Sequence, residues 1–186
     1  MYLLSTKALL SGTATTSYAM RIKRLSEGKI LGLPNASNFM YLYQFDNAGQ
    51  YAKAPISAFA TLVPPNNNVN NTIPLVVSPT GNTFVIGADG SVFNSNLNLL
   101  GSLSNFSNVY ASFDFSEDGT KLYASTTGYI NVFSLPSLAL EKVIPARNKG
   151  RGLFNIGNNQ LLIVADGFDN NTGVSATFLE KINIVK

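Results

Sequence analysis

The sequence predicts an all-β protein built from about four repeated antiparallel units, each of four short strands. Three observations carry this prediction. Apolar and polar residues alternate in short runs, which is the period of a strand with one buried face. Turn sequences rich in Gly, Asp, Asn and Pro separate these runs. One such turn, Ser78-Pro79-Thr80-Gly81, recurs as Ser116-Glu117-Asp118-Gly119 after 38 residues.

The clearest unit runs from Val109 to Ile144. Its expected strands are Tyr110–Ser116, Lys121–Ser125, Tyr129–Leu135 and Leu138–Ile144. Asp-Gly and Thr-Gly between the strands supply the positive φ that tight hairpins need, so Gly81, Gly119 and Gly128 are expected in such conformations. A helix over Ser137–Ile144 is the competing interpretation of the last strand, but eight residues are marginal for a helix. A meander of this length is close to one β-propeller blade of about 40–45 residues.

Two further units precede this one, over residues 17–60 and 73–107. The strands expected in them are Lys29–Leu33, Phe39–Asp46 and Gln50–Phe59, then Thr83–Gly87, Ser91–Asn96 and Asn98–Leu103. The first strand of the first unit would carry Arg21 and Lys23, so either these charges face a wet channel or this blade is irregular. The polar segment Val63–Thr72 between the units is expected to be an exposed loop.

The last unit, residues 150–186, supplies one strand fewer than the others. After the turn Ile156–Asn159 it offers Gln160–Ala165, a long loop at Asp166–Gly173, and Ala176–Val185. Residues 1–11 contain one spare strand, Tyr2–Leu10, which we predict completes this blade, in the same chain or in a neighbouring copy. The expectation is therefore one domain over residues 1–186, with blades at 17–60, 73–107, 109–145 and 150–186 plus 1–11.

The segments SEDGTKLYAS and SPTGNTFVIG resemble the turn-and-strand motifs of WD40-like and YVTN-type β-propeller repeats. The resemblance covers residues 73–144 and concerns the fold. The chain has no Trp and no His, so the Gly-His and Trp-Asp signatures of true WD40 repeats are absent. Such families usually have more than four blades. The resemblance therefore allows a small propeller, an open arc that needs partners, or a piece of a larger protein.

The composition leaves little room for catalysis. Without His and Cys, neither Ser-His-Asp nor Cys-His arrangements can form within this chain. Related propeller lactonases place catalytic groups at the central channel, and Asp114 is the one candidate for such a place. Asp114 stands between Phe113 and Phe115 and therefore faces away from them. The favoured interpretation is that it accepts hydrogen bonds from backbone N–H groups of a neighbouring strand. We expect no catalytic residue and no cofactor.

Metal ions, nucleic acids and membranes are not expected partners. The loop Asp166–Gly173 gathers oxygen ligands, but Phe168 occupies a position that an EF-hand reserves for a ligand, so no metal site is predicted. The basic residues near positions 21–24 and 147–151 form no extended stripe of the kind that binds nucleic acid. No apolar run reaches the ~18 residues of a membrane span, and the N-terminus is a poor signal peptide. The default expectation is the cytoplasm or a virion.

The surface is expected to be neutral and polar, because only 12% of residues are charged while 22 are Asn. Loops on a rigid scaffold are where proteins place recognition. The expected partner-binding residues are Asn66, Asn67, Asn68, Asp169, Asn170 and Asn171. The sequence thus predicts a non-catalytic scaffold for protein–protein interaction in a larger assembly, with self-association included. The alternatives are a structural subunit of a phage or viral particle or surface layer, and a fragment of a lactonase-like propeller enzyme.

Overall fold

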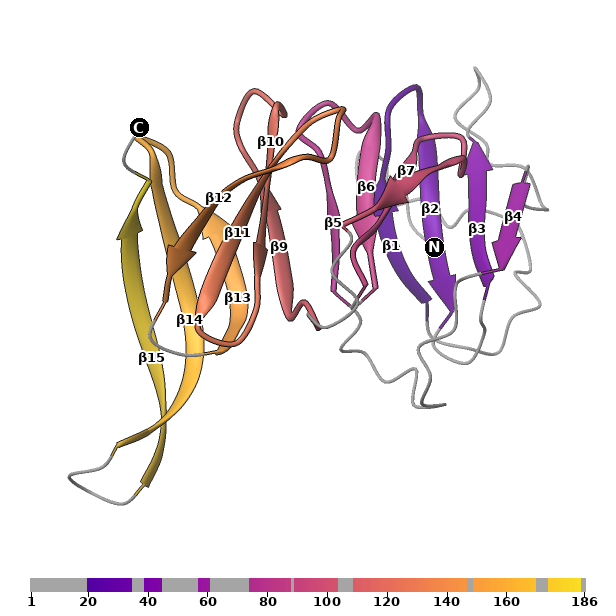
Figure 1. The fold of residues 1–186 in the computed structure, drawn as a ribbon. Coiled ribbons are helices and arrows are strands. Elements are labelled where there is room, and N and C mark those ends of the chain that lie inside the picture. Colours follow the sequence, from indigo (N-terminus) through magenta and orange to yellow (C-terminus); the bar gives the residue numbers. More distant parts are fainter. Residues whose placement is uncertain are drawn as a thin grey trace, which may run out of the picture. The chain divides into compact units, whose positions relative to one another are not determined.

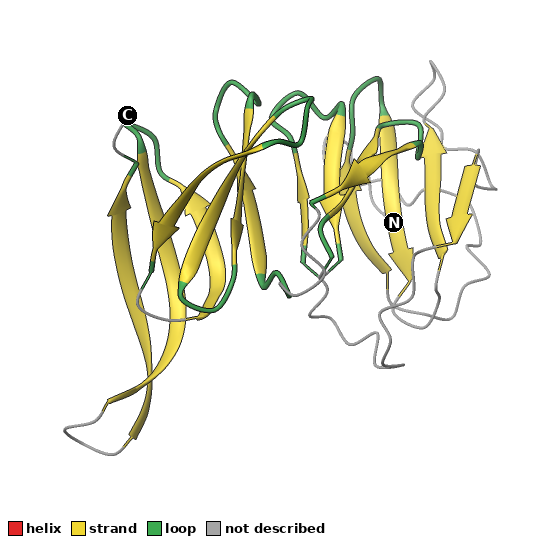
Figure 2. Ribbon diagram, in the orientation of Figure 1, coloured by secondary structure: helices red, strands yellow, loops and turns green. Residues whose placement is uncertain are grey.

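The fold is described by a computed structural model over residues 20–34, 39–44, 57–60, 74–87, 89–103, 109–146, 149–169 and 174–184. These residues form strands β1 to β15 and no helix (Figures 1 and 2). The all-β prediction is therefore confirmed for the described part of the chain. Leu140–Pro145, where a helix was the competing interpretation, is a strand.

The strands form four antiparallel sheets, each an up-and-down meander in chain order. The first contains β1 (Met20–Arg24), β2 (Lys29–Pro34), β3 (Phe39–Gln44) and β4 (Ser57–Ala60). The second contains β5 (Leu75–Val77), β6 (Thr83–Ile86), β7 (Ser91–Asn94) and β8 (Leu99–Ser102). The third contains β9 (Ser112–Phe115), β10 (Lys121–Ser125), β11 (Tyr129–Ser134) and β12 (Leu140–Pro145). The last contains β13 (Lys149–Asn155), β14 (Gln160–Asp169) and β15 (Val174–Asn183).

The chain divides into two compact units, Met1–Asn71 and Thr72–Lys186. The boundary falls in the segment that the sequence predicts to be a loop between blades, which lies outside the described residues. The first unit holds the sheet β1–β4, whose interior is formed by Leu31 and Leu33 of β2 with Met40 and Leu42 of β3. Lys23 is exposed on β1, and Arg21 is half-buried. The prediction of one domain over residues 1–186 stays a prediction.

The second unit stacks its three sheets face to face. Its first strands are neighbours, with β9 contacting both β5 and β13. Alternate residues of β10 enter different cores: Leu122 packs with Val85 and Phe113, whereas Tyr123 packs with Ile163. The period of two along one strand thus places the sheet β9–β12 between two apolar layers, as a blade is placed in a propeller.

The expected long loop at Asp166–Gly173 is wrong in its first half. β14 continues to Asp169, and β15 begins at Val174. The register is unbroken from Gln160↔Asn183 to Asp169↔Val174. Polar side chains suggested a loop, but backbone hydrogen bonds of an antiparallel ladder form whatever side chains the strands carry. The expected closing strand Tyr2–Leu10 lies outside the described residues, so closure stays a prediction.

Candidate functional site

The two turns that carry the sequence repeat have the same backbone hydrogen bonds. Ser78 N donates to Thr83 O at 2.8 Å, and Ser116 N donates to Lys121 O at 3.0 Å. Gly81 and Gly119 each donate to the Ser carbonyl three residues earlier, with φ of 75° and 69°. Gly128 has φ of 85°, so all three predicted positive-φ glycines are confirmed. The turns fix the ends of β6 and β10 at equivalent places in neighbouring sheets.

Asp118 organises the turn between β9 and β10. Its Oδ1 accepts hydrogen bonds from Ser116 Oγ at 2.6 Å, Thr120 Oγ1 at 2.8 Å and Thr120 N at 3.0 Å. These donors favour the ionised form and lower the pKa of Asp118 to about 2. The exposed turn therefore carries a fixed negative charge at neutral pH.

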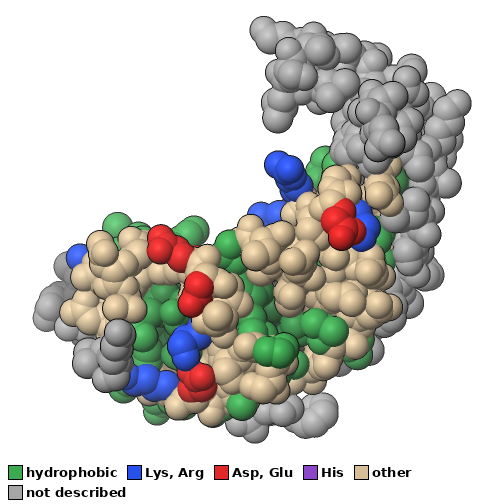
Figure 3. Space-filling model, turned by 90° about the horizontal axis from the view of Figure 1, so that it is seen from above, with side chains coloured by type: hydrophobic (Ala, Val, Ile, Leu, Met, Phe, Trp, Pro, Cys, Tyr) green, Lys and Arg blue, Asp and Glu red, His purple; other side chains and the backbone are tan. Residues whose placement is uncertain are grey.

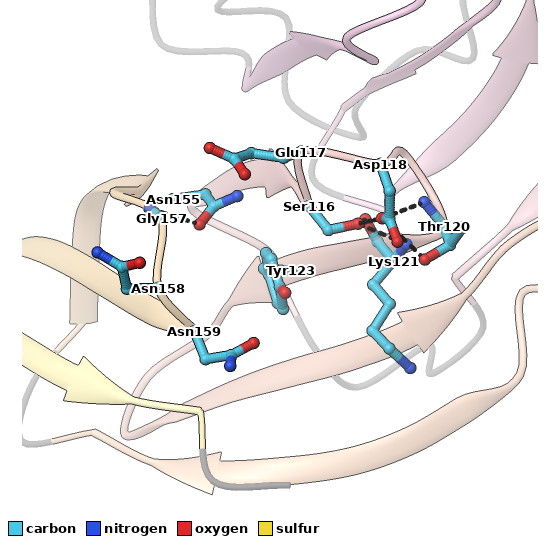
Figure 4. A pocket seen from close by; sticks show the side chains of 10 residues that line it. All are labelled: Ser116, Glu117, Asp118, Thr120, Lys121, Tyr123, Asn155, Gly157, Asn158 and Asn159. Carbon is cyan, nitrogen blue, oxygen red and sulfur yellow. Dashed lines mark hydrogen bonds between the residues drawn. The ribbon is translucent and has the colours of Figure 1, made fainter.

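A pocket of about 320 Å³ lies between this turn and the turn that joins β13 to β14 (Figure 4). Its lining residues come from two neighbouring sheets of the second unit, and most of them have polar side chains. The lining residues are Ser116, Glu117, Asp118, Thr120, Lys121, Tyr123, Asn155, Gly157, Asn158 and Asn159. A pocket of this size is at the lower end of the range for small-molecule sites, about 300–1,000 Å³.

Asp114 and Asn155 join the two sheets that carry this pocket. Asp114 Oδ2 accepts from the backbone N–H of Asn155 on β13 at 2.6 Å, and Oδ1 accepts from the N–H of Phe115 at 2.9 Å. Asn155 Nδ2 in turn donates to the carbonyl of Phe115 at 3.1 Å. The interpretation of Asp114 as an acceptor for a neighbouring strand is confirmed. Burial raises the pKa of Asp114 and outweighs the lowering by the two backbone donors.

Tyr123 spans the apolar layer and the pocket. Only 5% of this residue is exposed, and its ring packs with the core between the two sheets. In Figure 4 no hydrogen bond joins its hydroxyl to another of the lining residues drawn. Burial raises the pKa of Tyr123, and the negative charges of Asp118, Asp114 and Glu141 add to this rise. The hydroxyl is thus a neutral group held in a negative field.

The pocket and its surroundings contain more negative than positive side chains. Lys121 forms an ion pair with Glu141 of β12. Glu117 is exposed, and its Oε1 lies 3.6 Å from the position that a Cβ on Gly157 would occupy. The Glu117 side chain therefore extends from the first turn to the second. With Lys121 balanced by Glu141, Glu117 and Asp118 leave an excess of negative charge.

The outer edge of β15 is a second candidate interface (Figure 1). The sheet has the order β13-β14-β15, and none of the described strands pairs with the other side of β15. Two large apolar side chains stand out on this strand, Phe178 at 38% and Leu179 at 71% exposed. Elsewhere Figure 3 shows charged side chains covering a small part of one face, among neutral and hydrophobic ones.

The pocket was not predicted from the sequence. Asn66, Asn67, Asn68, Asn170 and Asn171 lie outside the described residues, and Asp169 is the last residue of β14 rather than a loop residue. Glu117 and Asn158-Asn159 were interpreted only as turn residues. Aligning the turns of neighbouring units would have placed them at the same end of the molecule.

Two absences hold for the part of the chain that the structure describes. Its Asp and Glu residues form no group of three or more that could hold a metal ion. It also contains no helix with the length and hydropathy of a membrane span.

Comparisons with known proteins give the fold. No protein-family model matches the sequence, and no curated protein matches it either. A candidate 6-phosphogluconolactonase of Bacteroides fragilis superposes with a TM-score of 0.59 at 15% identity, covering 90% of this chain and 55% of that one. The C-terminal WD40 domain of Sif2 superposes with a TM-score of 0.56 at 13% identity, covering 86% of this chain and 55% of that one. The chain thus spans about half the length of these structures. It is an all-β protein whose antiparallel sheets have a β-propeller-like fold.

Proposed function

We propose that the chain is a non-catalytic β-propeller scaffold that binds protein partners, further copies of itself included, as part of a larger assembly. The observation that carries the proposal is the outer edge of β15. A strand edge presents a row of backbone N–H and C=O groups, which is a template for pairing with another chain. Strand addition at such an edge is a common mode of protein recognition.

Comparison with the other outer edge strands of the second unit, β8 and β12, supports this choice. β8 has four residues and β12 has six, and their pairing is interrupted by register shifts at Val92/Phe93 and Val132/Phe133. Short and bulged edges are the usual protection against unwanted pairing. β15 has ten residues and an uninterrupted register with β14. It lacks both protections, and its first six residues, Val174–Leu179, carry no charge.

Substitution of Leu179 tests the proposal. Leu179→Lys places a charge on a side chain that is 71% exposed, so folding should be preserved while strand addition is opposed. Val109→Lys is the matched control, because Val109 is 62% exposed and lies outside the strands. Light scattering over a concentration series should show association of the wild type and of the control, and loss of association in Leu179→Lys. Equal masses for all three proteins at every concentration would contradict the proposal.

A further inference from the structure

We propose that the pocket between the β9–β10 and β13–β14 turns receives the guanidinium group of an arginine side chain presented by a protein partner. The inference rests on the proposed protein-binding function, because a protein supplies the arginine. The pocket is a binding site separate from the edge of β15, and the guanidinium group is the ligand that we assign to it. Three features of the pocket carry this inference: its unbalanced charge, the hydroxyl of a largely buried tyrosine that faces it, and its supply of hydrogen-bond acceptors.

The charge of the pocket favours a cation. Asp118 stays ionised through the whole physiological range, because three hydrogen bonds from its own turn stabilise the carboxylate. The positive charge of Lys121 is balanced by Glu141. Glu117 reaches across toward Gly157 and adds a second carboxylate at the rim. An entering anion would meet this excess of negative charge, whereas a cation would be attracted by it.

The Tyr123 hydroxyl is the second observation, independent of the acidic residues. Tyr123 is only 5% exposed, and it belongs to the pocket lining. A tyrosine hydroxyl can both donate and accept a hydrogen bond. In Figure 4 the other lining residues provide no such bond. The hydroxyl oxygen can accept a hydrogen bond from a ligand N–H group. The surrounding carboxylates favour a donor that carries a positive charge.

The acceptors match a guanidinium better than an ammonium. Guanidinium offers five N–H donors in one plane and no acceptor, and it pairs with carboxylates in a bidentate manner. The pocket offers the Glu117 carboxylate, the Tyr123 oxygen and the amide carbonyls of Asn158 and Asn159. A neutral sugar would use the amides but would gain nothing from the charge. The volume of about 320 Å³ suits one side chain.

Peptide titration followed by two-dimensional amide NMR tests this inference. The probe is acetyl-Gly-Arg-Gly-amide, and the comparison peptide carries citrulline, which has the same shape without the charge. The arginine peptide should shift the backbone amides of Gly119, Thr120, Gly157 and Asn158. It should bind about tenfold more tightly than the citrulline peptide, the effect of one charge-assisted hydrogen bond.

Two variants locate the interaction. Glu117→Gln removes a charge and Tyr123→Phe removes one hydroxyl, and each should weaken arginine binding by about tenfold. Asp166→Asn is the matched control: its carboxylate is 53% exposed, pairs with Arg151 and is not part of the pocket lining. Binding in this control should equal that of the wild type.

Three results would overturn the inference: no shifts at the pocket amides, equal affinity for the two peptides, or equal weakening in the control variant. Equal affinity would indicate a neutral polar ligand instead. Because peptide titration does not depend on assembly, it separates this inference from the proposed scaffold. If the arginine peptide does not bind while Leu179→Lys abolishes association, the arginine site alone would be overturned. If Leu179→Lys still associates while the arginine peptide binds, the β15 interface alone would be overturned.

Discussion

Asp114 shows how one side chain can join two sheets. It stands on β9 between two phenylalanines that enter one core, and it therefore points to the opposite face. There both of its oxygens accept backbone N–H groups, one of them from β13. The sequence pattern predicted the direction of this side chain and its role as an acceptor. It could not predict that Asn155 is the partner, because that depends on how far β13 is displaced along β9.

We predict that Asp114→Asn destabilises the fold. The amide has one oxygen where the carboxylate has two, so one backbone N–H loses its acceptor and faces an N–H₂ group. The cost of such an unsatisfied, partly buried donor is about 1–3 kcal/mol in the free energy of unfolding. Urea denaturation measures it. Asp166→Asn, which breaks only an exposed ion pair, should cost less than about 1 kcal/mol. If both variants lost the same stability, Asp114 would not hold the sheets together.

From the ionisation of Asp118 we predict a pH dependence of stability that is confined to acid pH. Its pKa of about 2 lies below the ordinary value of about 3.9, because its turn stabilises the charged form. A depressed pKa contributes stability that is complete above about pH 4–5 and is lost as the pH falls through about 2. The amide signal of Thr120, which donates to Asp118, should report a midpoint near that value. A midpoint close to 4 would show that the turn does not hold the carboxylate.

At the scale of elements, the turn between β9 and β10 predicts the effect of substituting Gly119. A Cβ here would meet only Pro79 Cδ at 3.8 Å, so space is available and the cost is conformational. With φ of 69°, Gly119→Val is expected to lose on the order of 1–2 kcal/mol, since β-branched residues avoid this region. Gly119→Asn should lose less, because Asn tolerates positive φ. Thermal and urea unfolding give both values. Equal stability of Gly119→Val and the wild type would contradict a positive φ at this turn position.

How well each element follows from the sequence depends on what determines it. Lys121–Ser125 was predicted as β10 with both of its ends, because local alternation and a flanking turn glycine set them. The second half of β14 was missed, because its pairing with β15 extends the strand beyond the apolar pattern that predicts it. The pocket was missed for a different reason. It exists only where two turns from neighbouring sheets approach, and no local pattern encodes that approach.

At the scale of the whole molecule, the last sheet has one strand fewer than the other three among the residues that the structure describes. Deleting residues 1–11 removes Tyr2–Leu10, the spare strand that we predict pairs with β15 of the same chain or of a neighbouring copy. We expect this truncation to aggregate or to lose much of its stability, because the long edge of β15 is then left without that partner. Sedimentation and urea unfolding of the truncated and full chains test this expectation. A truncated chain that is soluble and equally stable would refute pairing between the N-terminal segment and β15.

We propose that this chain binds proteins and does not catalyse. Native mass spectrometry of the protein taken from its natural source, without denaturation, tests it most directly. We expect a mass well above the 19.9 kDa of one chain, from further copies or other proteins. A single chain of 19.9 kDa that turns over a lactone or an ester, with activity abolished by Asp114→Asn, would contradict it.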